Sequence, residues 1–241
     1  MTLSLDRDLI YPDSDGQPMA DNTLQFRWIV LIKENLELLF ADNPQVFVAG
    51  DLLWYPVKSQ PKVRAAPDAM VAFNRPKGDR GSYKQWEENN IAPQVVFEIL
   101  SPGNTLKEMT KKLHFYERHG VEEYYIYDPQ RNDFHGLLRT GGSLNVIEET
   151  NNWTSPKLGI RFLLTEESLE IYRPDGGKFL TSLELEQKAE QEYQRAEQER
   201  QRAEQEYQRA EQERQRAEQE RQRAERLAAQ LKALGVDPDS K

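Results

Sequence analysis

A strict seven-residue repeat fills the C-terminal part of this 241-residue chain and leaves that part few conformations to adopt. From Ala189 onward the segments AEQEYQR and AEQERQR follow one another without interruption through five repeats. Ala, Glu, Gln and Arg are strong helix formers, and Glu and Arg recur three residues apart, where opposite charges support a helix. The repeat therefore predicts one long helix over residues 182–234, about 75–80 Å long at the usual rise per residue. Residues 235–241 are expected to form a disordered tail.

This helix carries only a weak seam for pairing with another helix. If the repeated Ala is placed at one core position of the heptad, the other core position holds Tyr193, Arg200, Tyr207 and Arg214 in turn. Stable coiled coils have Leu or Ile at these positions. Two interpretations stay open: association of residues 182–234 with a second copy (a homodimer) or with a partner protein, or a solvated single helix that acts as a spacer.

The remaining residues, 1–181, are numerous enough for one domain with a core. The chain has no Cys and three His, which excludes disulfides, thiolate metal ligands and a Cys nucleophile, and disfavours a cage of several histidines around a metal. No apolar run approaches the ~20 residues that a membrane-spanning helix needs. The first residues lack the basic and apolar regions of a secretory signal. We therefore expect a cytoplasmic protein with no membrane partner.

The net charge of −9 restricts the partners further. A protein that coats nucleic acid nonspecifically needs positive potential over its surface, so the charge disfavours that class. A nuclease stays compatible with the charge, because an acidic metal site can act on DNA beside a local basic patch.

The pattern of residues 1–181 predicts an α+β domain. Apolar residues recur at helical spacing in residues 24–40 and 105–120. Short β-rich runs bounded by Pro or Gly predict strands at residues 68–73, 95–100 and 123–128. The unit of strand, helix and strand that ends at residue 128 implies a crossover, so at least part of the sheet is parallel.

Two segments are harder to assign. Residues 46–57, VFVAGDLLWYPV, predict a strand or a bent hairpin. Residues 74–93 have no clear period and predict a long loop between two strands, and long loops in compact domains are often functional.

Glu98 is the sharpest single signal for a site. It interrupts the most apolar strand, VVFEIL, and alternation along the strand puts it on the same face as Val96 and Leu100. A charged group in such surroundings is costly to bury unless it is paired or bound to a metal. Both a sheet-end Glu paired with a Lys or Arg and a functional carboxylate fit this pattern.

Asp68 and Lys112 complete a set of residues suited to phosphodiester hydrolysis. Asp68 opens the strand that precedes the Glu98 strand, and Lys112 lies on the helix that follows it. Such hydrolysis uses a hard divalent cation held by carboxylates and a positive group beside the phosphate. We therefore predict Asp68 and Glu98 as ligands of Mg²⁺ (or Mn²⁺) and Lys112 as the third catalytic residue. Taken singly, Asp68 also fits a turn start and Lys112 a solvated helix surface.

The loop over residues 74–93 is locally basic on an acidic domain. Arg75, Lys77 and Arg80 lie within it, and we consider them as contacts to substrate phosphate, with a solvated insertion as the alternative. Ser101, directly after the Glu98 strand, is a further candidate for phosphate binding or for capping the next helix, although a turn fits its Ser-Pro context better.

Several segments together resemble one bacterial family. APDAMVAF, VVFEILSPGNT, SYKQWEEN and KKLHFYERHGVEEYYIYDP are similar to motifs of the Uma-two family, which is described as restriction-endonuclease-like and assigned to the PD-(D/E)XK nuclease superfamily. The similarity covers roughly residues 20–175 and leaves out the heptad repeats. It implies a mixed β-sheet flanked by helices.

The resemblance also implies roles for three residues. Asp68 matches the Asp of the family's Pro-Asp motif, and Glu98 matches the acidic residue of its second motif. The superfamily's Lys two positions after that acidic residue is absent, because Leu100 stands there. Lys112, four residues before Tyr116, matches a Lys on the family's helix, and we interpret it as the replacement.

The expected function is that of a metal-dependent endonuclease acting on DNA, in which residues 182–234 join two copies. The alternative is a nuclease-fold module without turnover that binds or regulates and assembles through its C-terminal helix. The acidic charge and Leu100 favour this alternative.

Overall fold

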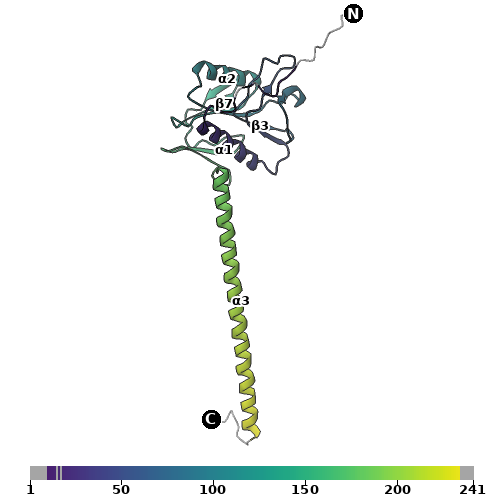
Figure 1. The fold of residues 1–241 in the computed structure, drawn as a ribbon, viewed down its shortest axis with the longest axis vertical. Coiled ribbons are helices and arrows are strands. Elements are labelled where there is room, and N and C mark those ends of the chain that lie inside the picture. Colours follow the sequence, from purple (N-terminus) through teal and green to yellow (C-terminus); the bar gives the residue numbers. More distant parts are fainter. Residues whose placement is uncertain (1–9, 15, 17, 234–241) are drawn as a thin grey trace, which may run out of the picture. The chain divides into compact units, whose positions relative to one another are not determined.

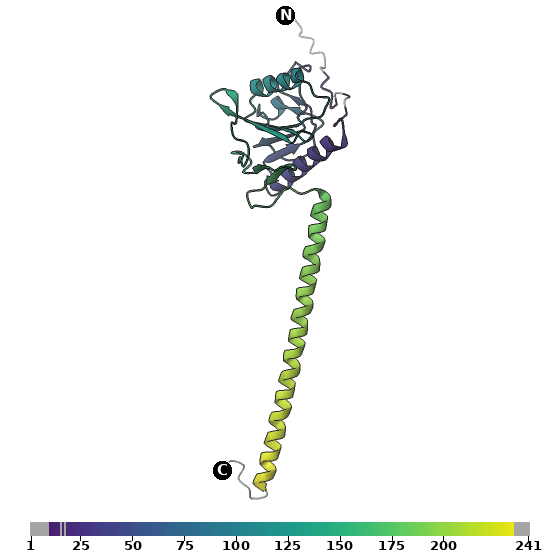
Figure 2. The same ribbon diagram turned by 90° about the vertical axis from the view of Figure 1, so that its left-hand side faces the viewer.

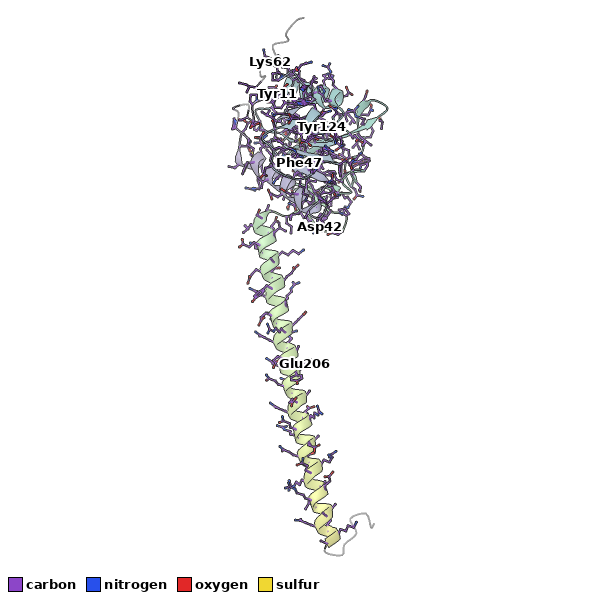
Figure 3. The ribbon with its side chains drawn as sticks, turned by 90° about the vertical axis from the view of Figure 1, so that its right-hand side faces the viewer. Tyr11, Asp42, Phe47, Lys62, Tyr124 and Glu206 are labelled. Atoms are coloured by element: carbon purple, nitrogen blue, oxygen red, sulfur yellow. The ribbon has the colours of Figure 1, made fainter. Side chains whose placement is uncertain are left out.

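The computed structural model of the protein describes residues 10–14, 16 and 18–233, and it divides the chain into two units, Met1–Thr181 and Ser182–Lys241. The described residues of the second unit form one helix, α3 (Ser182–Ala233), none of whose residues is buried. Figure 3 shows its side chains, among them Glu206, extending along its whole length. Leu234 and the expected disordered tail lie outside the described residues. No helix within the described ranges is both long and apolar enough to cross a membrane.

A six-stranded mixed sheet organises the first unit. Its strand order is β1-β3-β5-β6-β7-β8, and β5 and β6 are parallel while the other neighbours are antiparallel. This confirms the α+β class and the parallel crossover. The strands are β1 (Val46–Ala49), β3 (Ala69–Phe73), β5 (Val95–Ile99), β6 (Glu123–Asp128), β7 (Asp133–Thr140) and β8 (Ser143–Val146).

Two helices cover opposite faces of this sheet (Figures 1 and 2). Helix α1 (Thr23–Leu39) begins where the Asn22 side chain accepts a hydrogen bond from the Gln25 amide. Helix α2 (Leu106–His119) is capped by Thr105 and ends at Gly120, whose φ of 96° lies in the left-handed region that favours glycine.

Alternation along each strand divides the buried residues between the two faces. On β5, Val95, Phe97 and Ile99 belong to the core beneath α1, whereas Val96 packs in the core beneath α2. Glu98 therefore shares the α2 face with Val96. The tight crossover from β5 through α2 to β6 brings the helix over that face.

Of the two interpretations of residues 46–57, a strand or a bent hairpin, the structure excludes the hairpin and limits the first strand to β1. β1 pairs with β3, whereas β2 (Trp54–Tyr55) leaves that sheet and pairs in parallel with β4 (Tyr83–Lys84). Trp54 and Tyr55 are fully buried, so packing rather than local hairpin geometry decides where β2 goes.

The segment over residues 74–93 is not wholly irregular either. It contains β4 and a 3₁₀ helix, Gln85–Glu87. Strand β9 (Arg161–Leu164), which pairs with β10 (Leu169–Tyr172), was not among the predicted strands.

A buried carboxylate at the start of β6 ties the sheet to the segment before β9. Glu123 is fully buried and accepts hydrogen bonds from the Ser155 hydroxyl, the Lys157 amide and the Tyr125 hydroxyl.

We expect Glu123→Ala to lower the free energy of unfolding by about 3 kcal/mol, because these donors lose their acceptor inside the protein. The neighbouring Glu122→Ala removes only a half-exposed ion pair with Lys157 and should cost less than about 1 kcal/mol. Urea denaturation measures both, and equal losses would contradict this role for Glu123.

Candidate active site: a buried carboxylate pair and a lysine

Asp68 lies directly before β3, and Glu98 lies on the neighbouring antiparallel strand β5. The β3–β5 register pairs Ala69 with Phe97, which puts Asp68 beside Glu98 one residue further along. The Ile99 amide donates a hydrogen bond of 2.6 Å to Asp68 Oδ2. Both carboxylates are buried, with 8% and 2% of their residues' surface exposed. Like charges directly opposite in a sheet are destabilising, so a requirement other than stability accounts for this pair more readily.

Helix α2 supplies two partners for Glu98. Lys112 Nζ lies 2.7 Å from Glu98 Oε2, and the Tyr116 hydroxyl donates a hydrogen bond to Glu98 Oε1. Lys112 and Tyr116 are four residues apart and therefore lie on the same face of the helix. The structure thus brings together all three residues predicted as catalytic. The pairing of Glu98 with Lys112 also agrees with the alternative interpretation of Glu98 as a structural carboxylate paired with a Lys or Arg.

One ammonium lies beside two carboxyl groups here. Burial, and then the charge of Glu98, raise the pKa of Asp68 well above its usual value, although Lys112 and the Ile99 amide act in the other direction. Burial acts to lower the pKa of Lys112, but the charges of Glu98 and Asp68 outweigh it and raise that pKa. Lys112 therefore stays charged, whereas Asp68 keeps its proton to a higher pH than an ordinary aspartate does.

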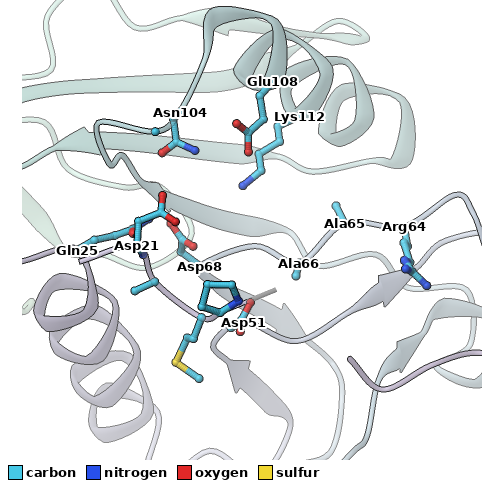
Figure 4. Close-up of a pocket in the computed structure, with 14 residues that line it drawn as sticks. Asp21, Gln25, Asp51, Arg64, Ala65, Ala66, Asp68, Asn104, Glu108 and Lys112 are labelled. Atoms are coloured by element: carbon cyan, nitrogen blue, oxygen red, sulfur yellow. The ribbon is translucent and has the colours of Figure 1, made fainter. Parts of the chain in front are cut away.

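A pocket of about 520 Å³ opens in front of the group. Asp68 and Lys112 line it, and Figure 4 shows Lys112 reaching from α2 toward Asp68. Glu98 is not among its lining residues. Further charged or polar side chains around the pocket are those of Asp21, Gln25, Asp51, Arg64, Asn104 and Glu108.

The donor set suits a hard divalent cation. Mg²⁺ is usually held by one or two carboxylates, with water and substrate as its other ligands. Asp68 and Glu98 offer two, and their excess negative charge is what a cation would neutralise. Among the described residues there is no group of three or more His, Asp or Glu side chains arranged for a metal.

Ser101 has a different setting from the one that phosphate binding requires. Its residue is buried, and its hydroxyl donates a hydrogen bond to the Asp21 carboxylate. Its amide donates to the Asn104 side chain at 2.8 Å, which closes the turn before α2. The turn interpretation describes these contacts, and phosphate binding by Ser101 stays a prediction.

The structure does not bring the three basic loop residues to the carboxylate pair. Arg75 and Arg80 both pair with Glu88, and the Arg80 guanidinium stacks 3.9 Å above the Phe47 ring. Lys77 donates hydrogen bonds to backbone carbonyls at the end of α1. Lys77 and Arg80 line a second pocket, beside β1. Contact of these three residues with substrate stays a prediction. None of them lines the pocket that contains Asp68, so their positions do not support it.

Some residues of the site were not predicted. Tyr116 could have been found, because it lies one helical turn after Lys112 and shares its face. Asp21 and Arg64 line the pocket from segments distant in sequence, and no pattern in the chain connects them with Asp68.

A family model described as "Uma2: Putative restriction endonuclease" matches residues 15–164, more than half of the chain, and the chain therefore belongs to the Uma2 family. This confirms the resemblance seen in the motifs.

Other comparisons add little. A search of curated proteins gave no match. One solved structure with similarity is titled as a "putative nuclease belonging to DUF820" from Anabaena variabilis ATCC 29413. It is 15% identical, covers 58% of this chain and 74% of its own, and has a TM-score of 0.40.

Replacing Asp68 should stabilise the metal-free protein. Since the folded state raises the pKa of Asp68, it binds this proton more tightly than the unfolded chain does, and stability falls as pH rises from about 4, the unfolded value, through the folded pKa. Asp68→Asn keeps an acceptor for the Ile99 amide and removes the charge. We expect it to raise the free energy of unfolding by about 0.5–2 kcal/mol at pH 8, with the gain shrinking toward pH 4.

Urea denaturation in EDTA at pH 4 to 8 measures this difference. Asp42→Asn, at an exposed position after α1, is the control and should change nothing. A destabilised Asp68→Asn variant at pH 8 would show that the Asp68 charge is well compensated.

Proposed function

We propose that this protein is a metal-dependent endonuclease that hydrolyses phosphodiester bonds, in DNA in the first instance. One observation carries the proposal: Asp68 and Lys112 line one pocket, and the buried Glu98 carboxylate lies directly behind Lys112, 2.7 Å from its ammonium. Membership of a family described as "Putative restriction endonuclease" supports the nuclease class. The metal and the DNA substrate are inferred from the chemistry of the residues.

Each residue has a role in this proposal. Asp68 and Glu98 hold Mg²⁺ or Mn²⁺, assisted by water. The bound metal supplies neutralisation of phosphate charge and a more acidic water. Lys112, which lines the pocket, orients the scissile phosphate or the attacking water and stabilises the charge that develops on the phosphate. Tyr116 fixes Glu98 through its hydrogen bond.

The reaction test uses supercoiled DNA and single-stranded DNA with Mg²⁺ and then Mn²⁺. We expect the wild type to nick or cut at least one substrate. Asp68→Asn and Glu98→Gln should lower the rate by about 100-fold or more, because each weakens the hold on the metal. Lys112→Gln should lower it as well, because it removes the positive charge beside the reacting phosphate. The exposed neighbour Lys111→Gln should keep wild-type activity and serves as the control.

A second candidate has specific support. Leu100 replaces the superfamily's lysine, and the Lys112–Glu98 ion pair already satisfies the buried Glu98. A folded wild type that cleaves neither substrate with either metal would favour a nuclease-fold binding or regulatory module. A cytoplasmic location stays a prediction for both candidates.

We also propose that the seam on α3 is an association surface. Tyr193 and Tyr207 are 68% and 67% exposed, and they lie two heptads apart on one side of the helix. Two copies joined there would place two sites on two DNA strands. Glutamates flank the seam on both sides in every heptad, so a pair of copies would be weak.

Sedimentation velocity of the full chain tests this association. We expect a dimer that dissociates on dilution, and expect Tyr193→Glu combined with Tyr207→Glu to give a monomer, because charge replaces apolar contact area in the seam. The matched control is Gln194→Glu with Gln208→Glu, which adds the same charge one residue further along and should leave the dimer. A monomeric wild type would exclude a second copy as the occupant and leave a partner protein.

A further inference from the structure

Lys112 stands between Glu98 and the pocket. Its side chain is 24% exposed and lines the pocket, whereas the Glu98 side chain is 2% exposed and does not reach the pocket wall. The only contact that links Glu98 to the pocket side is the 2.7 Å ion pair with the Lys112 ammonium, within the described residues. A cation that enters through the pocket meets Asp68 directly and meets Lys112 before Glu98.

The other oxygen of Glu98 is held from behind. Tyr116, whose hydroxyl donates to Glu98 Oε1, is completely buried and stacks against Trp54 within the α2-side core. Close packing there leaves the Glu98 carboxylate little freedom to turn another oxygen toward the pocket. The oxygen available to a metal is therefore Oε2, the one that Lys112 occupies.

We propose that Lys112 substitutes for the metal at Glu98 in the metal-free protein, so that a divalent cation binds Asp68 and Glu98 only as the Lys112 ammonium moves away. This inference rests on the metal site of the proposed function and assigns that site a regulation. The ammonium and a divalent cation on one carboxylate repel each other strongly at this burial, since an effective dielectric constant of about 20 weakens their repulsion far less than water does.

This exchange of Lys112 for a metal ion would couple metal binding to the placement of the Lys112 ammonium beside the substrate phosphate. While Lys112 is on Glu98, it neutralises a buried charge that would otherwise be costly to keep away from water. Once it is displaced, the same ammonium lies in the pocket, where a phosphate would bind. The long, flexible side chain of lysine suits two positions of one charge better than the planar guanidinium of arginine does.

Mn²⁺ binding to the full-length, metal-free protein tests the proposal without any nuclease assay. Titration followed by the electron paramagnetic resonance of free Mn²⁺ gives the dissociation constant. We expect Lys112→Gln, which keeps a hydrogen-bond donor for Glu98 but removes the charge, to bind Mn²⁺ at least tenfold more tightly than wild type. Lys111→Gln, which removes an equal charge from an exposed position next to it, should leave the affinity unchanged. Glu98→Gln should weaken binding, which places the ion at this site.

Stability provides a second readout. Without metal, Lys112→Gln should unfold at lower urea concentration than wild type, because Glu98 loses its counter-charge. Saturating Mn²⁺ should raise the midpoint of the variant more than that of the wild type. If Lys112→Gln proves too unstable without metal, Lys112→Met is measured in the same titration. Equal or weaker Mn²⁺ binding by the Lys112 variants would overturn the proposal.

The outcomes separate this inference from the nuclease proposal. Cleavage by wild type together with an unchanged Mn²⁺ affinity in Lys112→Gln overturns the exchange alone. Tighter Mn²⁺ binding in Lys112→Gln, with no cleavage by wild type, supports the exchange and contradicts the nuclease. Absence of Mn²⁺ binding in every variant overturns the exchange whatever the cleavage assay shows.

Discussion

The contact between the Lys112 ammonium and the buried Glu98 carboxylate is the interaction on which the site depends. Two acidic side chains face each other on adjacent strands, and a sheet interior does not accept two unpaired charges. Lys112 and Tyr116 of helix α2 each donate a hydrogen bond to one oxygen of Glu98 and so compensate its burial. The position of α2 is therefore set partly by charge as well as by the apolar residues beneath it.

That contact is available because of the topology. The parallel pairing of β5 and β6 requires a crossover, and the crossover helix lies on the face of the sheet to which Glu98 points. Helix α1 covers the opposite face with Ile29, Ile32 and Leu36 and keeps water from the sheet. Because the pairing of β3 with β5 brings Asp68, directly before β3, beside Glu98, both carboxyl groups lie close to Lys112, and Asp68 and Lys112 line one pocket.

Local signals explain what the sequence could predict. The helix over 105–120 has an N-capping Thr, an apolar face and a Gly stop, and the structure places α2 within one residue of those bounds at each end. Glu98 was detectable because a charge in an apolar strand stands out. The chemistry of phosphodiester hydrolysis singled out Asp68 and Lys112 beside it, the family's motifs matched the same residues, and the geometry brings all three together.

Features that depend on distant packing escaped prediction. Strand β2 pairs with β4, where Trp54 is buried, and no local sequence pattern indicates this pairing. The positive charge of the loop over residues 74–93 was visible, but the pairing of Arg75 and Arg80 with Glu88 was not, because it needs the folded path of the loop. Asp21 reaches the pocket from the segment before α1, far from Asp68 in sequence.

The most direct measurement of the central claim is a crystal structure of the full chain soaked in Mn²⁺, with data collected for the anomalous scattering of manganese. If Asp68 and Glu98 form a metal centre, one strong anomalous peak lies within about 2.5 Å of an oxygen of each carboxylate. Lys112 then lies away from Glu98, in the pocket. A crystal saturated with Mn²⁺ that shows no peak there, with the Lys112–Glu98 pair intact, would contradict the claim.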